Sequence, residues 1–259
     1  MAASYPFRSA LVTGASSGIG EELTRQLAAA GVPVIAVARR AERLEALAAE
    51  LGTVEVLVAD LGGRDGQALV AARIADADRP VDLVVNNAGF GTSGAFERLD
   101  IERLSDEITL NVDALTRLTH AALGVMVPRR RGWVLNVSSF ASFQPAPRLA
   151  VYAATKAYVT SLGESLHEEV KGAGVVVTTL CPGLVRTEFQ SVSNTSHYQT
   201  DFPDVLWLPL AEVVSAALDA TAKGRAIVVP GALYKGASWA VGITPRWLRR
   251  VASGRVQRT

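Results

Sequence analysis

Tyr152 and Lys156 stand four residues apart, and Ser139 precedes the tyrosine by thirteen residues. Positions i and i+4 share one face of a helix, so this spacing predicts a phenol beside an ammonium group. A free tyrosine has a pKa of about 10, and a neighbouring positive charge lowers such a pKa by roughly 1–3 units. Tyr152 could then exchange a proton with a substrate oxygen near neutral pH, to which Ser139 donates a hydrogen bond. The same spacing also fits a solvated helix face, so the pair indicates catalysis only if a second motif supports it.

A glycine-rich turn near the start of the chain supplies that motif. Gly14, Gly18 and Gly20 follow the apolar run Ala10-Leu11-Val12. Glycine permits backbone angles and close approaches that a side chain prevents, and a helix N-terminus offers N–H groups and partial positive charge to a pyrophosphate. The Gly-x-x-x-Gly-x-Gly spacing therefore predicts a dinucleotide-binding turn between the first strand and the first helix. A strand-to-helix turn without a ligand is the alternative.

The residues after the second predicted strand indicate which dinucleotide is bound. Arg39 and Arg40 follow this strand, and no acidic residue is present there. An acid at this point binds the ribose 2′-hydroxyl of NAD, whereas an arginine accommodates the 2′-phosphate of NADP. A charged hydrogen bond contributes roughly 1.5–3 kcal/mol, about one to two powers of ten in affinity. We predict NADP(H) over NAD(H), with Arg39 the stronger candidate because it comes first; two solvated arginines opening a helix are the alternative.

Taken together, the motifs between about Arg8 and Val229 resemble the short-chain dehydrogenase/reductase family, in its classical-length branch. The segment from Thr13 to Gly20 matches the family's cofactor turn, and Asn86-Asn87-Ala88-Gly89 matches its Asn-Asn-Ala-Gly motif. Asp60-Leu61 matches the pair that flanks the adenine. The run from Cys181 to Thr187 contains the Pro-Gly-x-x-x-Thr segment that contacts the nicotinamide amide in that family.

The resemblance also implies a catalytic tetrad of Asn111, Ser139, Tyr152 and Lys156. Ser139 is preferred to Ser138 because the family places its serine thirteen residues before the tyrosine. In the family the asparagine holds a water in the proton relay, the lysine also binds the nicotinamide ribose, and the 4-pro-S hydride is transferred. The candidate cofactor-binding residues are Gly14, Ser16, Ser17, Gly18, Ile19, Gly20, Arg39, Arg40, Asp60, Leu61, Asn87, Ala88, Gly89, Tyr152, Lys156, Pro182, Gly183, Val185 and Thr187.

Short apolar runs alternate with longer amphipathic segments along the chain. The predicted strands are 10–12, 34–37, 54–58, 81–85, 133–137, 175–180 and 226–229; the predicted helices are 18–30, 41–51, 67–77, 101–126, 149–171 and 210–222. Strands that are apolar on both faces and separated by helices indicate a parallel sheet covered on both sides. The sequence therefore predicts one α/β domain over residues 1–259, a doubly wound parallel seven-stranded sheet of the Rossmann type.

The composition and charge of the chain limit which partners, metal sites and locations are expected. The chain has 259 residues, is 49% hydrophobic and has a formal net charge of +1, so nothing suggests nucleic acid as a partner. The single cysteine, Cys181, permits no internal disulfide. We see neither a signal peptide nor a membrane-spanning run, and therefore expect a cytoplasmic protein. His120, His167 and His197 lack metal-ligand spacing, so no metal site is assigned.

Several segments bear on the substrate and on assembly. Residues 190–208 are polar and contain Pro203, and are expected to be a substrate lid or else a surface loop. The predicted walls of an apolar substrate pocket are Phe90, Phe140, Phe143, Leu184 and Phe189. The apolar faces of the helices around Asn111 and Tyr152 suggest a homodimer or homotetramer, as is common in the family.

The C-terminal extension, residues 231–259, is basic and carries Trp239 and Trp247. It could contact a subunit or the substrate pocket, lie on anionic lipid, or form a solvated terminus whose tryptophans cover the edge of the core. Of these, membrane contact is the least expected.

The leading hypothesis is an NADP(H)-dependent oxidoreductase that interconverts a ketone or aldehyde and an alcohol. Reduction of a 3-oxoacyl thioester is the alternative within this class, and a catalytically idle nucleotide sensor is the alternative outside it. A methyltransferase also places a glycine-rich turn after a strand, but it has no use for the Ser139, Tyr152 and Lys156 set.

Overall fold

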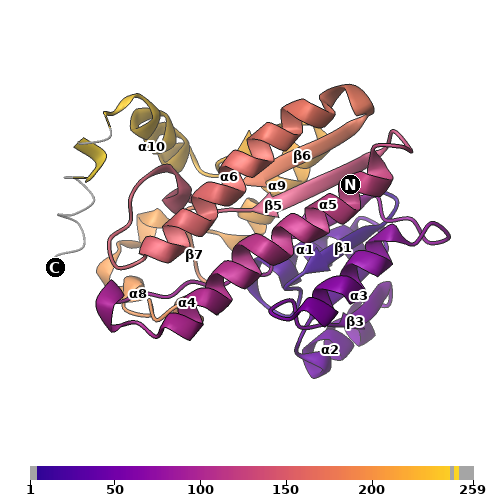
Figure 1. Cartoon of the computed structure of the whole chain (residues 1–259), viewed down its shortest axis with the longest axis horizontal. Helices are drawn as coiled ribbons and strands as arrows, with labels where there is room; N and C mark the ends of the chain where they lie inside the picture. Colours follow the sequence, from indigo (N-terminus) through magenta and orange to yellow (C-terminus); the bar gives the residue numbers. More distant parts are fainter. Residues whose placement is uncertain (1–4, 246–247, 251–259) are drawn as a thin grey trace.

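The fold was obtained as a computed structural model, which describes residues 5–245 and 248–250 (Figure 1). Its centre is a parallel seven-stranded sheet in the order β3-β2-β1-β4-β5-β6-β9, so the prediction of a doubly wound Rossmann sheet is confirmed. The strands are β1 (Ala10–Thr13), β2 (Val34–Ala38), β3 (Val54–Val58), β4 (Leu83–Asn86), β5 (Gly132–Val137), β6 (Val175–Leu180) and β9 (Ile227–Val228).

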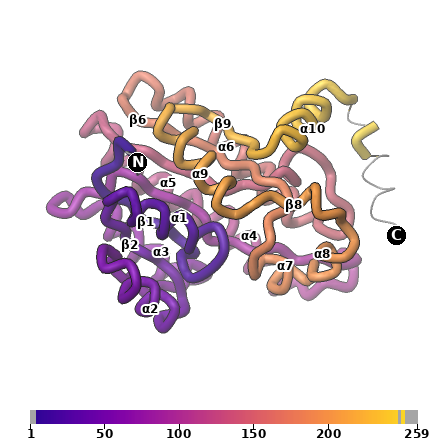
Figure 2. The backbone as a smooth tube through the Cα atoms, turned by 180° about the vertical axis from the view of Figure 1, so that it is seen from behind, coloured from indigo at the N-terminus to yellow at the C-terminus, as the bar shows by residue number. Residues whose placement is uncertain are grey.

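Helices cover both faces of the sheet because consecutive strand residues point to opposite sides. One face packs on α1 (Gly18–Ala29), α2 (Ala41–Leu51) and α9 (Leu210–Ala222). The opposite face packs on α3 (Arg64–Ala75), α5 (Leu115–Met126) and α6 (Ala150–Val170). In Figure 2, which is turned by 180° from Figure 1, α1 and α9 lie on the side of the sheet that faces the viewer.

Strand order decides where a ligand can bind. The chain winds outward in one direction from β1 to β3 and in the other from β4 to β9, so the order reverses between β1 and β4. In open parallel sheets the binding crevice lies outside the carboxyl ends of the strands at such a reversal. The glycine turn follows β1 and the Asn86–Gly89 motif follows β4, so the topology brings both to this crevice.

The helical region predicted over residues 101–126 differs from the expectation. It consists of α4 (Ile101–Ile108), a π-helical turn over Thr109–Ala114, and α5. A π-turn widens the helix and disrupts its regular hydrogen-bond ladder, and such turns are frequent at functional sites. Asn111 lies inside this turn.

The segment predicted as a lid has structure of its own. It contains most of α7 (Phe189–Val192), α8 (Tyr198–Asp201) and the short strand β8 (Trp207–Leu208), which pairs with β7 (Leu184–Val185) outside the main sheet. Beyond β9, α10 (Ala232–Ile243) begins the C-terminal extension. No helix among the described residues is long and apolar enough to cross a membrane.

Helix α6 lies unusually close to β6. A Cβ atom at Gly163, in the middle of α6, would clash with the Thr179 hydroxyl and would lie 3.3 Å from the Thr179 Cβ. Glycine at this point therefore lets the helix that carries Tyr152 and Lys156 approach the sheet. Gly124 on α5 is exposed and has no atom within 4 Å of the equivalent Cβ position.

These two glycines form a matched pair for testing the packing of α6. We expect Gly163→Ala to lower the free energy of unfolding by about 1–3 kcal/mol, because the added methyl overpacks the α6–β6 contact. We expect Gly124→Ala to raise it by about 0.5–1 kcal/mol, because alanine is the better helix former and meets no obstacle. Urea denaturation of both variants measures the difference; equal effects would contradict the close approach of α6.

Candidate active site

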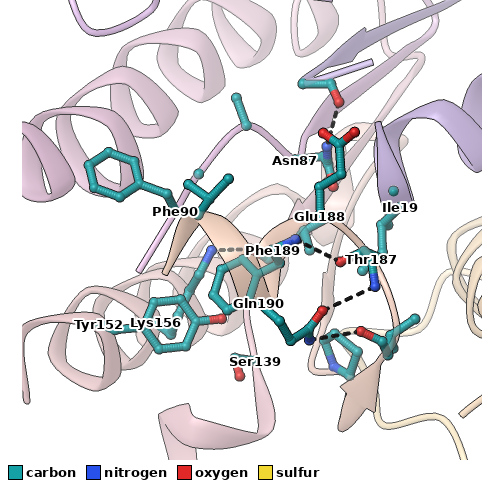
Figure 3. A pocket seen from close by; sticks show the side chains of 18 of the residues that line it. Ile19, Asn87, Phe90, Ser139, Tyr152, Lys156, Thr187, Glu188, Phe189 and Gln190 are labelled. Atoms are coloured by element: carbon teal, nitrogen blue, oxygen red, sulfur yellow. Dashed lines mark hydrogen bonds between the residues drawn. The ribbon is translucent and has the colours of Figure 1, made fainter. Parts of the chain in front are cut away.

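Ser139, Tyr152 and Lys156 meet at the carboxyl end of β5 (Figure 3). Tyr152 and Lys156 come from the first two turns of α6 and are both buried. The Lys156 Nζ lies 5.7 Å from the centroid of the Tyr152 ring and donates a hydrogen bond of 2.9 Å to the Val137 carbonyl oxygen.

The two serines after β5 have different surroundings. The Ser138 hydroxyl donates to the Lys156 carbonyl oxygen at 2.8 Å and also meets the Thr160 hydroxyl, so it joins β5 to α6 inside the core. The Ser139 Oγ accepts from the Ala141 N–H at 3.1 Å and lines the cavity. That bond leaves the Ser139 hydroxyl hydrogen available to donate, as a group that binds a substrate oxygen must.

The charge states of the pair differ from the expectation. Burial raises the pKa of Tyr152 to about 12, and the interaction with Ser139 only partly opposes that rise. Burial also lowers the pKa of Lys156 to about 8. The prediction that the lysine lowers the tyrosine pKa is therefore wrong for the protein by itself. The physical reason is that both groups are removed from water, which disfavours the charged form of each.

Asn111 does not line the cavity, but it positions residues that do. Its side-chain oxygen accepts from the Phe90 N–H at 3.1 Å, and its amide nitrogen donates to the Phe90 carbonyl oxygen at 2.8 Å. The same nitrogen reaches the Thr155 hydroxyl at 3.2 Å. Asn111 therefore connects the segment after β4 to α6, between Tyr152 and Lys156.

The glycine turn has the geometry of a phosphate cradle. Gly14 and Gly18 have φ angles of +67° and +55°, which side chains rarely adopt. The Asn87 amide nitrogen donates to the Thr13 carbonyl oxygen at 2.9 Å and to that of Gly14 at 3.3 Å, which fixes the turn against the end of β4. Gly20 does not line the cavity; it lies under the turn, where a Cβ would clash with the Gly14 carbonyl oxygen and Asn87.

Arg40, rather than Arg39, is held against this turn. Its guanidinium donates to the Ser16 Oγ at 3.0 Å and to the Glu188 carboxylate at 2.8 Å. Arg39 also lines the cavity, but its side chain is 74% exposed and its nearest acidic partner, Asp60, lies 3.9 Å away. The geometry thus favours Arg40 as the cation beside the turn.

One cavity of about 650 Å³ joins the turn to the Tyr152 hydroxyl end of the site. Of the predicted site residues it includes all except Gly20, Asn111 and Phe143. Phe143 packs edge-on against Phe140 with the ring centroids 5.8 Å apart, so it supports the wall from behind. Phe189 faces Tyr152 at 5.3 Å between centroids.

The lid and the C-terminal extension also line the cavity, through residues that the sequence analysis did not single out. The walls that were not predicted include Leu149, Tyr198, Phe202, Leu206 and Tyr234. The Tyr234 hydroxyl donates to the Leu206 carbonyl oxygen at 2.9 Å and accepts from the Leu184 N–H at 3.1 Å. No local pattern marks these residues, because only contacts between distant segments place them here.

For the C-terminal extension, one alternative was a solvated terminus whose tryptophans cover the edge of the core, and the structure excludes it for one of the two tryptophans. Trp239 is 71% exposed, so it does not cover the edge of the core. Trp247 lies outside the described residues. Tyr234 instead gives α10 its contact with the substrate side of the cavity, as one of the alternatives expected.

Comparison with known proteins agrees with this geometry. The family model of the short chain dehydrogenases matches residues 8–197. The chain belongs to the short-chain dehydrogenase/reductase family. An uncharacterized oxidoreductase of Myxococcus xanthus is 40% identical over 197 residues, which cover 74% of this chain and 78% of that relative. A serine 3-dehydrogenase of Agrobacterium fabrum is 37% identical over 185 residues, covering 70% and 74%.

Solved members of the short-chain dehydrogenase/reductase family share the whole fold. A short-chain dehydrogenase from Sphingobium yanoikuyae, in complex with NADPH, is 32% identical with a TM-score of 0.82, covering 97% of this chain and 96% of that one. A bulky-bulky ketone specific alcohol dehydrogenase from Comamonas testosteroni is 29% identical with a TM-score of 0.78, covering 97% and 94%. The chain is accordingly an oxidoreductase of this family, whose members bind NAD(P).

The lowered pKa of Lys156 has a measurable effect on stability. In the unfolded chain the ammonium regains its ordinary pKa of 10.5, so the unfolded state binds more protons between about pH 8 and pH 10.5. Burying the charged form therefore costs most below pH 8. We expect the stability of Lys156→Met relative to the parent to fall by roughly 2 kcal/mol from pH 7 to pH 10.5, because the parent becomes more stable as its buried ammonium loses a proton and the variant has no such group.

Urea denaturation at pH 7 and pH 10 measures this dependence. Lys171→Met, at an exposed lysine just after the same helix, is the control, and its stability relative to the parent should not change in this way. A Lys156→Met variant whose difference from the parent is the same at pH 7 and pH 10 would contradict the lowered pKa of a buried ammonium.

Proposed function

We propose that this chain is an NADP(H)-dependent oxidoreductase that interconverts an apolar ketone or aldehyde and the corresponding alcohol. The observation that carries the proposal is the continuous cavity, which joins the glycine turn and Arg40 to Ser139, Tyr152 and Lys156. A sensor that only binds a nucleotide does not need an acid and a hydrogen-bond donor at the far end of its site. The idle sensor is therefore less favoured.

The residues present fit the dinucleotide. The positive φ angles of Gly14 and Gly18 leave the N-terminal N–H groups of α1 open to a pyrophosphate. Thr187 approaches Gly18 closely, since a Cβ at Gly18 would lie 3.1 Å from the Thr187 Cβ, so the segment just before the lid reaches the turn. Arg40 would contact the 2′-phosphate, and Lys156 would hold the nicotinamide ribose. When bound, the nicotinamide supplies or accepts the hydride.

Tyr152 carries the proton in the proposed reaction. Because its pKa is about 12, the phenol is protonated at neutral pH and can act directly as the acid in reduction. Its O–H bond breaks as the proton passes to the substrate oxygen, on which negative charge develops as the carbonyl is reduced. Ser139 donates a hydrogen bond to that oxygen. In oxidation the proton moves the other way.

The walls of the cavity favour an apolar substrate. Aromatic and aliphatic side chains line the cavity, among them Phe90, Tyr198, Leu206 and Phe189, which packs against Tyr152. Pockets of this kind bury an apolar ligand and orient it with a few polar groups. The expected assembly is a homodimer or homotetramer, with exposed apolar side chains such as Ile108 and Tyr158 available on the helices near the site.

Removing the Tyr152 hydroxyl tests the proposed acid. We expect Tyr152→Phe to lower kcat with NADPH and an apolar ketone by at least about a hundredfold, while NADPH binding changes little, because the hydroxyl acts on the substrate. Steady-state kinetics on a panel of ketones and alcohols, with NADPH fluorescence titration, measures both. Tyr158→Phe, on the same helix but bonded to Thr116, is the control and should retain both. Tight NADPH binding without turnover on the whole panel would instead favour the sensor.

Removing the Arg40 guanidinium tests the choice of dinucleotide. We expect Arg40→Ala to weaken NADPH binding about ten- to a hundredfold relative to NADH, because the charged contact to the 2′-phosphate is lost. Arg43→Ala is the matched control, since Arg43 also pairs with Glu188, at 2.6 Å, without lining the cavity. Fluorescence titration with both dinucleotides gives the ratio. If Arg39→Ala changes this ratio and Arg40→Ala does not, the sequence-based preference for Arg39 is restored.

A further inference from the structure

Glu107 is a carboxyl group that the proposed chemistry leaves unused. It lies in the last turn of α4, one helical turn before Asn111, and its side chain is fully buried, with 0% exposure. Neither carboxyl oxygen has a hydrogen-bond partner among the described residues. Buried charged groups are costly unless something compensates them, so this glutamate requires an explanation that packing alone does not provide.

The groups around Glu107 are those of the active site. Lys156 and Arg103 attract its carboxylate, and the carboxylate in turn acts on Tyr152 and Lys156 of α6. Thr92, in the segment after β4, lies beside it; the two side chains interact without meeting the geometry of a full hydrogen bond. Helices α4 and α6 contact each other, and one turn beyond Glu107 the Asn111 side chain bonds to Thr155, next to Lys156.

The lysine itself has few groups that favour its positive charge. Burial is the largest influence on the Lys156 pKa, and it lowers that pKa. Two groups oppose burial, Glu107 first and Cys181 second. Burial raises the pKa of the Cys181 thiol, so the thiol is neutral at physiological pH and cannot supply a compensating charge. Glu107 is then the anion that supports the ammonium.

We propose that Glu107 is a positioning residue of the active site, a buried counter-charge that keeps Lys156 an ammonium ion. The inference deepens the proposed function, since it rests on the role assigned to Lys156. It involves electrostatics alone: no bond changes other than protonation of the carboxylate from solvent.

The pH range follows from the two groups. Burial raises the pKa of Glu107 to about 6, an effect that Thr92, Lys156 and Arg103 only partly offset. The Lys156 pKa is about 8. Both groups are therefore charged between about pH 6 and pH 8, and the pair loses the carboxylate below this range and the ammonium above it. The charged pair is complete in the neutral range alone.

The charge on Lys156 can be read directly in the free protein by NMR. The chain contains four lysines, Lys156, Lys171, Lys223 and Lys235, so the Cε resonances of ¹³C-lysine-labelled protein are few enough to assign with Lys156→Arg. We expect the Lys156 resonance of Glu107→Gln to titrate about one pH unit below that of the parent protein. In Glu107→Asp the Lys156 midpoint should return part of the way to that of the parent, and the midpoint of the exposed Lys171 should not change in either variant.

An unchanged Lys156 midpoint in a folded Glu107→Gln variant would overturn the proposal, because the amide keeps the shape and removes the charge. If Glu107→Gln does not fold, Glu107→Met serves as the second test, because it also removes the charge. It should lower the Lys156 midpoint in the same direction, and no change in the folded variant would equally count against the proposal. Because the titration needs neither dinucleotide nor turnover, its failure is distinguishable from failure of the proposed hydride transfer.

Discussion

Burial of Tyr152 and Lys156 between α6 and the carboxyl end of β5 is the constraint on which the site depends. Removal from water raises the pKa of the phenol and lowers that of the ammonium, so each is driven toward its neutral form. The burial follows from packing: Gly163 lets α6 approach β6, and Ser138 fixes the Lys156 backbone to β5. A helix lying farther from the sheet would leave both side chains in solvent, with ordinary pKa values.

The surrounding polar groups compensate for this burial in different ways. The Val137 carbonyl oxygen accepts from Lys156, Ser139 interacts with Tyr152, and Glu107 supplies a negative charge. Asn111 contributes indirectly, since its side chain is fully engaged in holding Phe90 and Thr155. The π-helical turn around Asn111 separates α4 from α5, so that Glu107 and Asn111 both face inward at the same junction.

Glu188 links the cofactor end of the cavity to its substrate end through hydrogen bonds. This residue lies two positions before the lid and accepts hydrogen bonds from Arg40 and Arg43, which follow β2 (Glu188 is labelled in Figure 3). Gln190 then holds the same segment by accepting from the Thr187 N–H at 3.1 Å and donating to the Val185 carbonyl oxygen at 3.0 Å. The lid is therefore an ordered wall of the cavity, with its base fixed beside the dinucleotide turn.

The sequence by itself determined the parallel sheet, its helices and the glycine turn, because these depend on local properties: apolar periodicity within each element, and backbone angles that only glycine adopts readily at Gly14 and Gly18. It also identified most residues that line the cavity, because most of the family motifs follow strands whose carboxyl ends face the same crevice. The tertiary structure alone decided the charge states of Tyr152 and Lys156, the contact of Arg40 rather than Arg39 with the glycine turn, the position of Phe143 behind the wall, the entry of Tyr234 into the cavity and the burial of Glu107. Each of these depends on burial or on contacts between segments far apart in the chain, and neither spacing nor composition encodes how much water a side chain keeps once those segments have packed.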